Sequence, residues 1–278
     1  MNKVTSAPIE DLARFFDVER RSEREHAVTL QSYFGEGQTF DLLGRAALAV
    51  QEASDALELA SLRAVFLRPL PHGVPLRLTV EDVGAPFEGR AVRRVQVRGE
   101  LLLAEVTALF TSPEPAPDYA PLMPEKLVEP EQIPTTHETA RREGWEQYAA
   151  GPIEFRRLNP VWPPPPEERL LPHHEWLRPR VPLPSDPRLH TAALALASHF
   201  YNHWEFQWRI DPGFAYERFA ILEHAVWLHR AARWDDWWLL DAESDLARHG
   251  RARSRRRIFA RDGRLLASAT THARVGTH

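Results

Sequence analysis

The sequence predicts an α+β protein made of two similar halves, in each of which an antiparallel sheet wraps around one helix. Two observations carry this prediction. An apolar helical pattern followed by four strand-like runs occurs twice, and a stretch dense in proline separates the two occurrences. The length of 278 residues and the apolar fraction of 43% allow one large domain or two small ones with a sizeable core.

The first half starts with a helix and continues with four strands. Residues 40–57 carry apolar side chains at helical spacing, namely Leu42, Leu43, Ala46, Ala47, Val50 and Ala53. Strand-like runs follow at residues 62–67, 76–82, 90–98 and 101–112. Gly99-Glu100 marks a hairpin turn before the last run. We therefore expect residues 1–112 to form the N-terminal unit.

The second half repeats this order. Residues 188–208 show the helical pattern again, through Leu189, Ala193, Leu196, Ala197, Phe200 and Trp204. Strand-like runs follow at residues 219–229, 236–243, 251–260 and 264–275. Asp262-Gly263, a strong hairpin signal, stands where Gly99-Glu100 stands in the first half. Residues 188–278 are therefore expected to form the C-terminal unit.

Residues 113–187 join the two halves and are rich in proline. This stretch holds about three quarters of the chain's 24 prolines. Proline fixes φ and removes a backbone donor, so we expect neither a central strand nor a long helix here. The stretch is interpreted as an extended connector with one helix near residues 137–150. Its aromatic side chains favour a connector docked on the surface over a disordered one.

Composition excludes several classes of function. The absence of cysteine rules out disulfides, thiolate nucleophiles and cysteine-ligated metal sites. A formal net charge of -4 argues against nucleic-acid binding. No apolar run approaches the roughly 18 residues of a membrane span, and the N-terminal segment lacks the apolar core of a secretory signal. A cytoplasmic protein is the expectation.

Motifs for metals, cofactors and serine nucleophiles are missing as well. His199 and His203 have the spacing of a helical metal pair, but no third ligand accompanies them. No Gly-x-Ser-x-Gly elbow, phosphate-binding loop or dinucleotide fingerprint occurs. We therefore expect no metal and no cofactor.

Several strings in the second half resemble the type II acyl-CoA thioesterases. That family has a strand of the form hydrophobic-Asp-His-x-hydrophobic-Trp-hydrophobic-His-Arg, and residues 221–230 fit it with Glu223 in place of Asp. The tryptophan-rich run that ends in Glu243-Ser244, the arginine-rich run 251–259 and the Asp262-Gly263 turn follow in the family's order. In the first half, residues 66–69 and 92–95 fit two further family strings. The resemblance spans roughly residues 30–275 and implies a double hot-dog fold.

The resemblance also implies a site. In the family an Asp, a Thr or Ser, and a Gln hold a water against the thioester carbonyl, without a covalent intermediate. The matching positions here are Glu223, Asp245 and Thr271, and all three differ from the family pattern. Two neighbouring carboxylates would raise one pKa and favour a shared proton. The family's Gly-Gly before the first helix is missing too.

The residues around Glu223 leave its role open. The carboxylate lies in a strand that is apolar on both faces, where an unpaired charge is rarely buried. One interpretation is a catalytic carboxylate that points into an apolar pocket between the halves. The other is a structural salt bridge to an arginine of residues 251–257. For Asp245 and Thr271 the alternatives are a strand-end residue and an ordinary strand threonine.

Substrate-binding residues are expected on the arginine-rich strand. Arg251, Arg253 and Arg255 share one strand face and could hold the phosphates of coenzyme A. The alternative is a solvated outer face balanced by acidic residues. Trp227 is the candidate for the wall of an acyl pocket, although most tryptophans of the chain are expected in the core.

The leading hypothesis is an acyl-CoA thioesterase-like hydrolase that acts through a positioned water. The alternative is a non-catalytic acyl-CoA or acyl-binding hot-dog protein, because three site positions are altered. A hydratase is the weaker third hypothesis, since the expected Asp/His motif is absent. The expected partner is an acyl-CoA or related thioester. Exposed sheet edges favour a homodimer or homotetramer.

Overall fold

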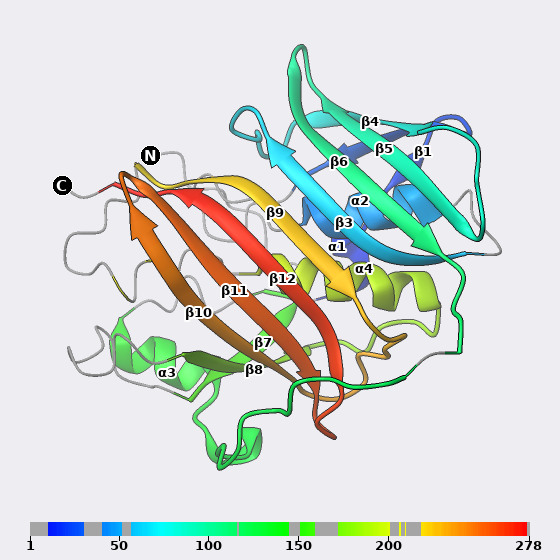
Figure 1. Ribbon diagram of the computed structural model, residues 1–278. Coiled ribbons are helices and arrows are strands. Elements are labelled where there is room, and N and C mark those ends of the chain that lie inside the picture. Colours follow the sequence, from blue (N-terminus) through cyan, green and yellow to red (C-terminus); the bar gives the residue numbers. More distant parts are fainter. Residues whose placement is uncertain are drawn as a thin grey trace.

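One antiparallel sheet of twelve strands organises the molecule (Figure 1). The computed structural model describes residues 11–30, 41–51, 57–115, 117–144, 151–158, 172–200, 206, 209 and 218–276. Among the predicted features, Ala53, residues 145–150, His203 and Trp204 lie outside these ranges.

The first half contains two helices and six strands. It begins with α1 (Leu12–Phe15), β1 (Glu19–Arg20) and β2 (Glu25–Thr29), followed by the core helix α2 (Leu42–Gln51). The main strands are β3 (Glu58–Phe66), β4 (Pro75–Asp82), β5 (Arg90–Arg98) and β6 (Leu102–Thr111). The predicted helix and the four predicted strands are confirmed. The sequence analysis missed β1 and β2, which extend the sheet beyond β4.

The connector region contributes structure of its own. It holds the 3-10 helix η1 (Pro130–Gln132), α3 (Thr136–Glu143), β7 (Ile153–Arg157) and β8 (His173–Pro179). Helix α3 starts at a capping box of Thr135 and Glu138 and ends where Gly144 takes φ 79°. Strand β8 pairs with β10, and β7 pairs with β8. The expectation that this stretch only wraps the surface is therefore wrong, because short strands fit between its prolines.

The second half completes the sheet. Helix α4 (Pro187–His199) precedes β9 (Ala220–Leu228), β10 (Trp238–Arg248), β11 (Arg251–Ala260) and β12 (Leu265–Arg274). Asp186 caps α4 by accepting from the backbone N–H of Arg188, and Pro187 stands in its first turn. The predicted helix and four strands of this half are confirmed. The domain boundaries at residues 112 and 187 stay predictions.

The two halves join edge to edge. The strand order is β1-β2-β4-β5-β6-β3-β9-β12-β11-β10-β8-β7, with β3 and β9 at the junction. There Leu62 lies opposite Val226, and Arg63 lies opposite Ala225. The sequence predicts two separate sheets, whereas the structure has one continuous sheet, because each half offers an unpaired edge to the other.

The two long helices pack on one another and on the same face of the sheet, which we call the inner face (Figure 1). Leu42, Leu43, Ala46 and Ala47 of α2 are completely buried, as are Ala192, Ala193, Ala195 and Ala197 of α4. Small alanine side chains let the helices approach closely. The core is therefore shared by both halves.

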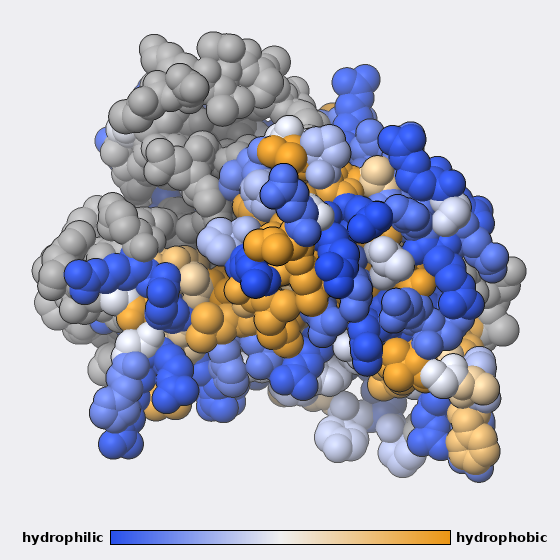
Figure 2. Space-filling view, turned by 90° about the horizontal axis from the view of Figure 1, so that it is seen from above, coloured by the Kyte–Doolittle hydropathy of each residue, from blue (hydrophilic) through white to orange (hydrophobic). Residues whose placement is uncertain are grey.

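Hydrophilic side chains cover much of the described part of one face of the molecule, and hydrophobic residues gather near its middle (Figure 2). None of the helices in the described part of the chain is long and apolar enough to cross a bilayer.

Candidate functional site

A row of small polar side chains crosses the inner face of the second half. In register across four neighbouring strands lie Ser244 of β10, Ser254 of β11, Thr271 of β12 and His224 of β9. All four are buried, and Ser254, Thr271 and His224 are completely inaccessible. Buried polar groups of this kind are expected to be hydrogen-bonded.

His224 links the row to helix α4. Its Nδ1 lies 2.8 Å from Thr271 Oγ1, and its Nε2 lies 3.0 Å from Ser198 Oγ. The Ser198 hydroxyl donates to the carbonyl of Ala195 at 2.7 Å, so the Ser198 oxygen accepts from His224 Nε2–H. In the neutral imidazole, Nδ1 then accepts a hydrogen bond from the Thr271 hydroxyl. We call these three residues the His224 relay.

The surroundings keep His224 neutral. Burial lowers the pKa of His224 well below its ordinary value, and the nearby His199 and Arg256 lower it further. The rings of His199 and His224 are 4.7 Å apart, and Phe66 of β3 stacks on His199 at 5.7 Å. The relay therefore lies where the two halves meet.

Arg256 binds backbone carbonyls at the C-terminal end of α4, next to the His224 relay. Its guanidinium donates to the carbonyl of Ser198 at 3.2 Å and to the carbonyl of Phe200. The last carbonyls of a helix lack partners within the helix, and a cation there also complements the helix dipole. Arg256 thus holds the backbone that carries Ser198 in place.

Glu223 does not point into this region. Its Oε1 accepts a hydrogen bond from Arg63 Nε at 2.8 Å, its Oε2 lies 3.9 Å from His272 Nδ1, and the side chain is 30% exposed. Side chains alternate along a strand, and His224 and Val226 face the helices, so Glu223 faces outward. The expectation of a carboxylate in an apolar pocket is wrong. The predicted salt bridge exists, but its arginine comes from β3 of the first half.

Asp245 also lies on the outer face. It accepts from Arg253 Nε at 3.0 Å and Arg253 Nη2 at 2.6 Å, and Arg255 Nε lies 3.0 Å away. The hydrogen bond from Arg253 lowers the pKa of Asp245. Three strand spacings of about 4.8 Å separate β9 from β10, so Glu223 and Asp245 are roughly 14 Å apart. The expected shared proton is excluded by this separation.

The structure therefore does not bring the three predicted catalytic residues together. Thr271 is buried on the inner face, whereas Glu223 and Asp245 form ion pairs on the outer face. Their roles in catalysis stay predictions. Sequence reasoning missed the role of His224 and Ser198 in this site. Side chains alternate along a strand, so His224 shares a face with Val226, and this could have indicated His224 as a residue of the site. No local sequence pattern indicated Ser198.

The predicted substrate-binding residues are all on the outer face. Arg253 and Arg255 pair with Asp245 and Glu243, as the solvated-face alternative expects. Trp227 lies opposite Ser61 and Ser268 and is 46% exposed. It therefore does not line the inner region of the His224 relay.

Sequence comparisons match this chain with acyl-CoA thioesterases. A family model described as the acyl-CoA thioesterase C-terminal domain matches residues 124–275. Acyl-CoA thioesterase 2 of Haemophilus influenzae is 25% identical over 242 residues, which covers 79% of this chain and 80% of that protein. Acyl-coenzyme A thioesterase 8 of Mus musculus is 28% identical over 269 residues, with 89% and 80% covered.

Solved structures show the same fold. Acyl-CoA thioesterase II TesB2 from Mycobacterium marinum superposes with a TM-score of 0.77 at 23% identity, covering 96% of this chain and 98% of that one. A tesB protein of Mycobacterium avium subs paratuberculosis gives 0.78 at 22% identity, with 95% and 98% covered. A protein with a hot dog fold from Alicyclobacillus acidocaldarius gives 0.72 at 15% identity, with 94% and 96% covered. The predicted double hot-dog fold is confirmed.

Proposed function

Because the chain belongs to the acyl-CoA thioesterase family, whose C-terminal domain model matches more than half of its length, we propose that it hydrolyses acyl-CoA thioesters. The observation that carries the proposal is the hydrogen bond between Thr271 and His224. The resemblance to the family matches Thr271 with the position of a site glutamine. A hydroxyl bound to a neutral imidazole is an arrangement that can take up a proton.

The chemistry follows from the direction of the hydrogen bonds. The Thr271 hydroxyl donates to His224 Nδ1, so its oxygen is left to accept from a water. When that water attacks the thioester carbon, its proton passes to Thr271 Oγ1 while the Thr271 proton passes to His224 Nδ1. The resulting oxyanion collapses and the carbon–sulfur bond breaks. The thiolate of coenzyme A takes a proton from the Thr271 hydroxyl, while the imidazolium returns its Nδ1 proton to Thr271. Ser198 fixes the ring for these transfers.

Thr271 and His224 are completely buried, so the thioester must reach them from the inner side of the sheet. Ser244 and Ser254 continue the polar row next to Thr271. They supply further polar groups near the reacting atoms. Exclusion of bulk water strengthens each of these hydrogen bonds.

Glu223→Gln tests the predicted catalytic carboxylate. The substitution keeps the side-chain size and removes the charge that pairs with Arg63. We expect turnover to stay within roughly tenfold of wild type, because the carboxylate faces away from Thr271, whereas loss of a general base would cost about 100-fold or more. The measurement is the rate of thiol release from an acyl-CoA. A drop of the larger size would show that Glu223 leaves its ion pair and acts on the substrate.

The test of the function itself is a thiol-release assay on the full chain. Because the chain has no cysteine, a thiol reagent detects only released coenzyme A. Acyl-CoAs from short to long chain length are incubated with the protein, and heat-denatured protein is the control. Time-dependent release that is absent from the control supports hydrolysis. Bound acyl-CoA without release at any chain length would instead show the binding-only function, which the family and its relatives do not favour.

The proposal also covers the cellular compartment and the oligomeric state. The protein is proposed to act in the cytoplasm as a homodimer or homotetramer. The outermost strands, β1 and β7, leave edges that a second copy could pair with. Light scattering at several concentrations tests the assembly, since a mass of 31.9 kDa at all of them would exclude it.

A further inference from the structure

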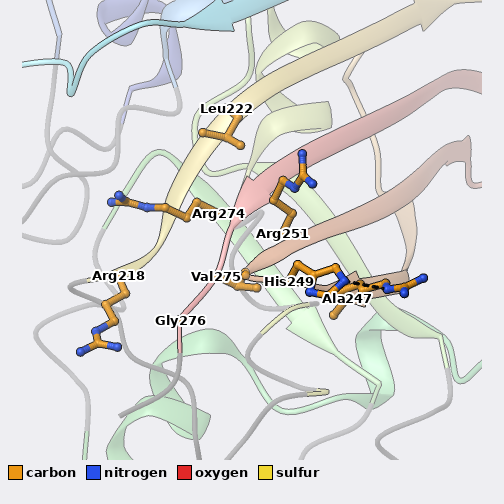
Figure 3. A pocket seen from close by; sticks show the side chains of 10 residues that line it. Arg218, Leu222, Ala247, His249, Arg251, Arg274, Val275 and Gly276 are labelled. Atoms are coloured by element: carbon orange, nitrogen blue, oxygen red, sulfur yellow. Dashed lines mark hydrogen bonds between the residues drawn. The ribbon is translucent and has the colours of Figure 1, made fainter.

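A hollow with a basic lining lies at one end of the second half's strands. Its volume is about 1110 Å³, and its lining includes Arg218, Leu222, Arg248, His249, Arg251 and Arg274. Figure 3 shows the arginine side chains spread around the ends of β11 and β12 and the segment before β9. We call this feature the basic hollow.

Three of its arginines form a row straight across the sheet. Arg248 of β10 lies opposite Arg251 of β11, and Arg251 lies opposite Arg274 of β12. All three side chains are exposed. Like charges on directly opposite residues destabilise a sheet. An anion bound between these three arginines would relieve this repulsion.

Within the described part of the chain, the two neighbouring rows have such compensation, whereas Arg251 and Arg274 have none. Arg253 is paired with Asp245, and Arg255 with Glu243. Within the described residues, Arg251 and Arg274 have no acidic partner, and Arg248 donates to His249 Nε2 at 3.1 Å. The ion pairs of Arg253 and Arg255 agree with the alternative of a solvated face balanced by acids, and no such pair is seen for Arg251 among the described residues.

The local backbone holds this row in place. His249 and Gly250 form the two-residue turn between β10 and β11, with φ of 53° and 70°. Two successive left-handed residues match a type I′ turn, which keeps Arg248 and Arg251 directly opposite one another. Gly276 passes so near Arg218 that a Cβ there would lie 2.5 Å from the Arg218 Cβ. The lining is therefore set by turn geometry and close packing.

We propose that the basic hollow binds the phosphate groups of the coenzyme A portion of the substrate. This inference rests on the proposed function. The side chains spread apart, so a ligand with several separated phosphates suits them better than one phosphate ion, and coenzyme A carries a pyrophosphate and a 3′-phosphate (Figure 3). Arg274 lies three residues after Thr271 on β12, roughly 10 Å along the strand.

The direct test measures binding by calorimetry on the full chain. The probes are coenzyme A, adenosine 3′,5′-bisphosphate and inorganic phosphate. We expect the first two to bind, more weakly as salt rises, and inorganic phosphate to bind much more weakly. In the variant Arg251→Gln/Arg274→Gln, each charged hydrogen bond that is lost should raise the Kd for coenzyme A about tenfold.

Arg264→Gln is the matched control. Arg264 lies at the opposite end of the β11–β12 hairpin and pairs with Asp262, and it is exposed, as Arg251 and Arg274 are. The substitution removes one positive charge outside the basic hollow, so the Kd for coenzyme A should stay at the wild-type value. Equal weakening in Arg264→Gln and the double variant would overturn the proposal, because it would indicate a general charge effect. Unchanged binding in the double variant would overturn it as well.

A substrate without phosphates separates this inference from the proposed function. The double variant should raise KM for an acyl-CoA and leave KM for the corresponding acyl-pantetheine unchanged. If wild type hydrolyses both thioesters with the same KM, the basic hollow does not bind the phosphates, yet the hydrolase function stands. If neither thioester is hydrolysed but the double variant loses coenzyme A binding, the hollow stands and the hydrolase function fails.

Discussion

Replacing Thr271 by valine is expected to lower acyl-CoA turnover by about 100-fold or more, the usual effect of losing proton-transfer assistance. Valine keeps the shape of the threonine side chain but cannot accept from water or donate to His224. The fold should survive, because an unsatisfied buried His224 Nδ1 costs about 1–3 kcal/mol. Thiol release gives the rate, and a thermal unfolding curve checks the fold.

Thr270→Val is the matched control for this substitution. Thr270 neighbours Thr271 on β12, but it lies opposite Ala225 on the outer face, whereas Thr271 lies opposite His224. The same chemical change there should leave turnover near the wild-type rate. Thr271→Ser should recover most of the activity, because it restores the hydroxyl. A Thr271→Val protein that is folded and turns over as fast as Thr270→Val would remove Thr271 from the mechanism.

The pH profile of wild-type turnover provides a second readout of the relay. His224 must be neutral to accept the proton, and its burial lowers its pKa. A lowered pKa means that the imidazole stays neutral below the ordinary histidine value of about 6.5. The acidic loss of kcat is therefore expected below that pH. A loss centred at or above it would show that another group titrates.

Asp41→Ala is expected to lower the free energy of unfolding by about 3–5 kcal/mol, the cost of leaving one buried charge unpaired. Asp41 and Arg45 are 0% and 1% exposed, and Arg45 Nε donates to Asp41 Oδ2 at 2.9 Å. Arg45 also donates to the carbonyl of Asp17, so it ties the start of α2 to the segment after α1. Denaturant unfolding of wild type and variant measures the difference.

Asp262→Ala is the control for an exposed ion pair. Asp262 and Arg264 are 55% and 58% exposed, so this loss should cost less than about 1 kcal/mol. Asp41→Ala/Arg45→Met should be more stable than Asp41→Ala alone, because it removes the stranded charge. An Asp41→Ala variant no less stable than Asp262→Ala would contradict the buried-pair argument.

Local sequence patterns predict most of the helices and strands of the fold. The apolar spacing of residues 42–50 and 189–197 predicts α2 and α4, and both helices form there. Strand-like runs predict the eight main strands, and Asp262-Gly263 predicts the β11–β12 hairpin, where Gly263 takes φ 88°. These features depend on neighbours within a few residues, which is why a single sequence contains them.

The candidate site was predicted only in part. Thr271 was predicted as a site residue from its place in a family motif, and its role stays a prediction. The structure shows it buried beside His224 in the second half. We expected the Glu223 side chain to point inward. Both faces of its strand carry apolar residues, so composition alone did not show which face is the inner one. Strands β7 and β8 were missed because their pairing partner β10 lies far away in the chain.

By itself the sequence determined the two helix-and-sheet units, their order and the absence of cysteine chemistry, because these follow from composition and short-range periodicity. Only the tertiary structure decided which strand face meets the helices, that β3 and β9 fuse the halves, and that Ser198, His224 and Thr271 meet. The physical reason is that register and the inward face are set by contacts between distant segments, and a shift of one residue would exchange Glu223 for His224.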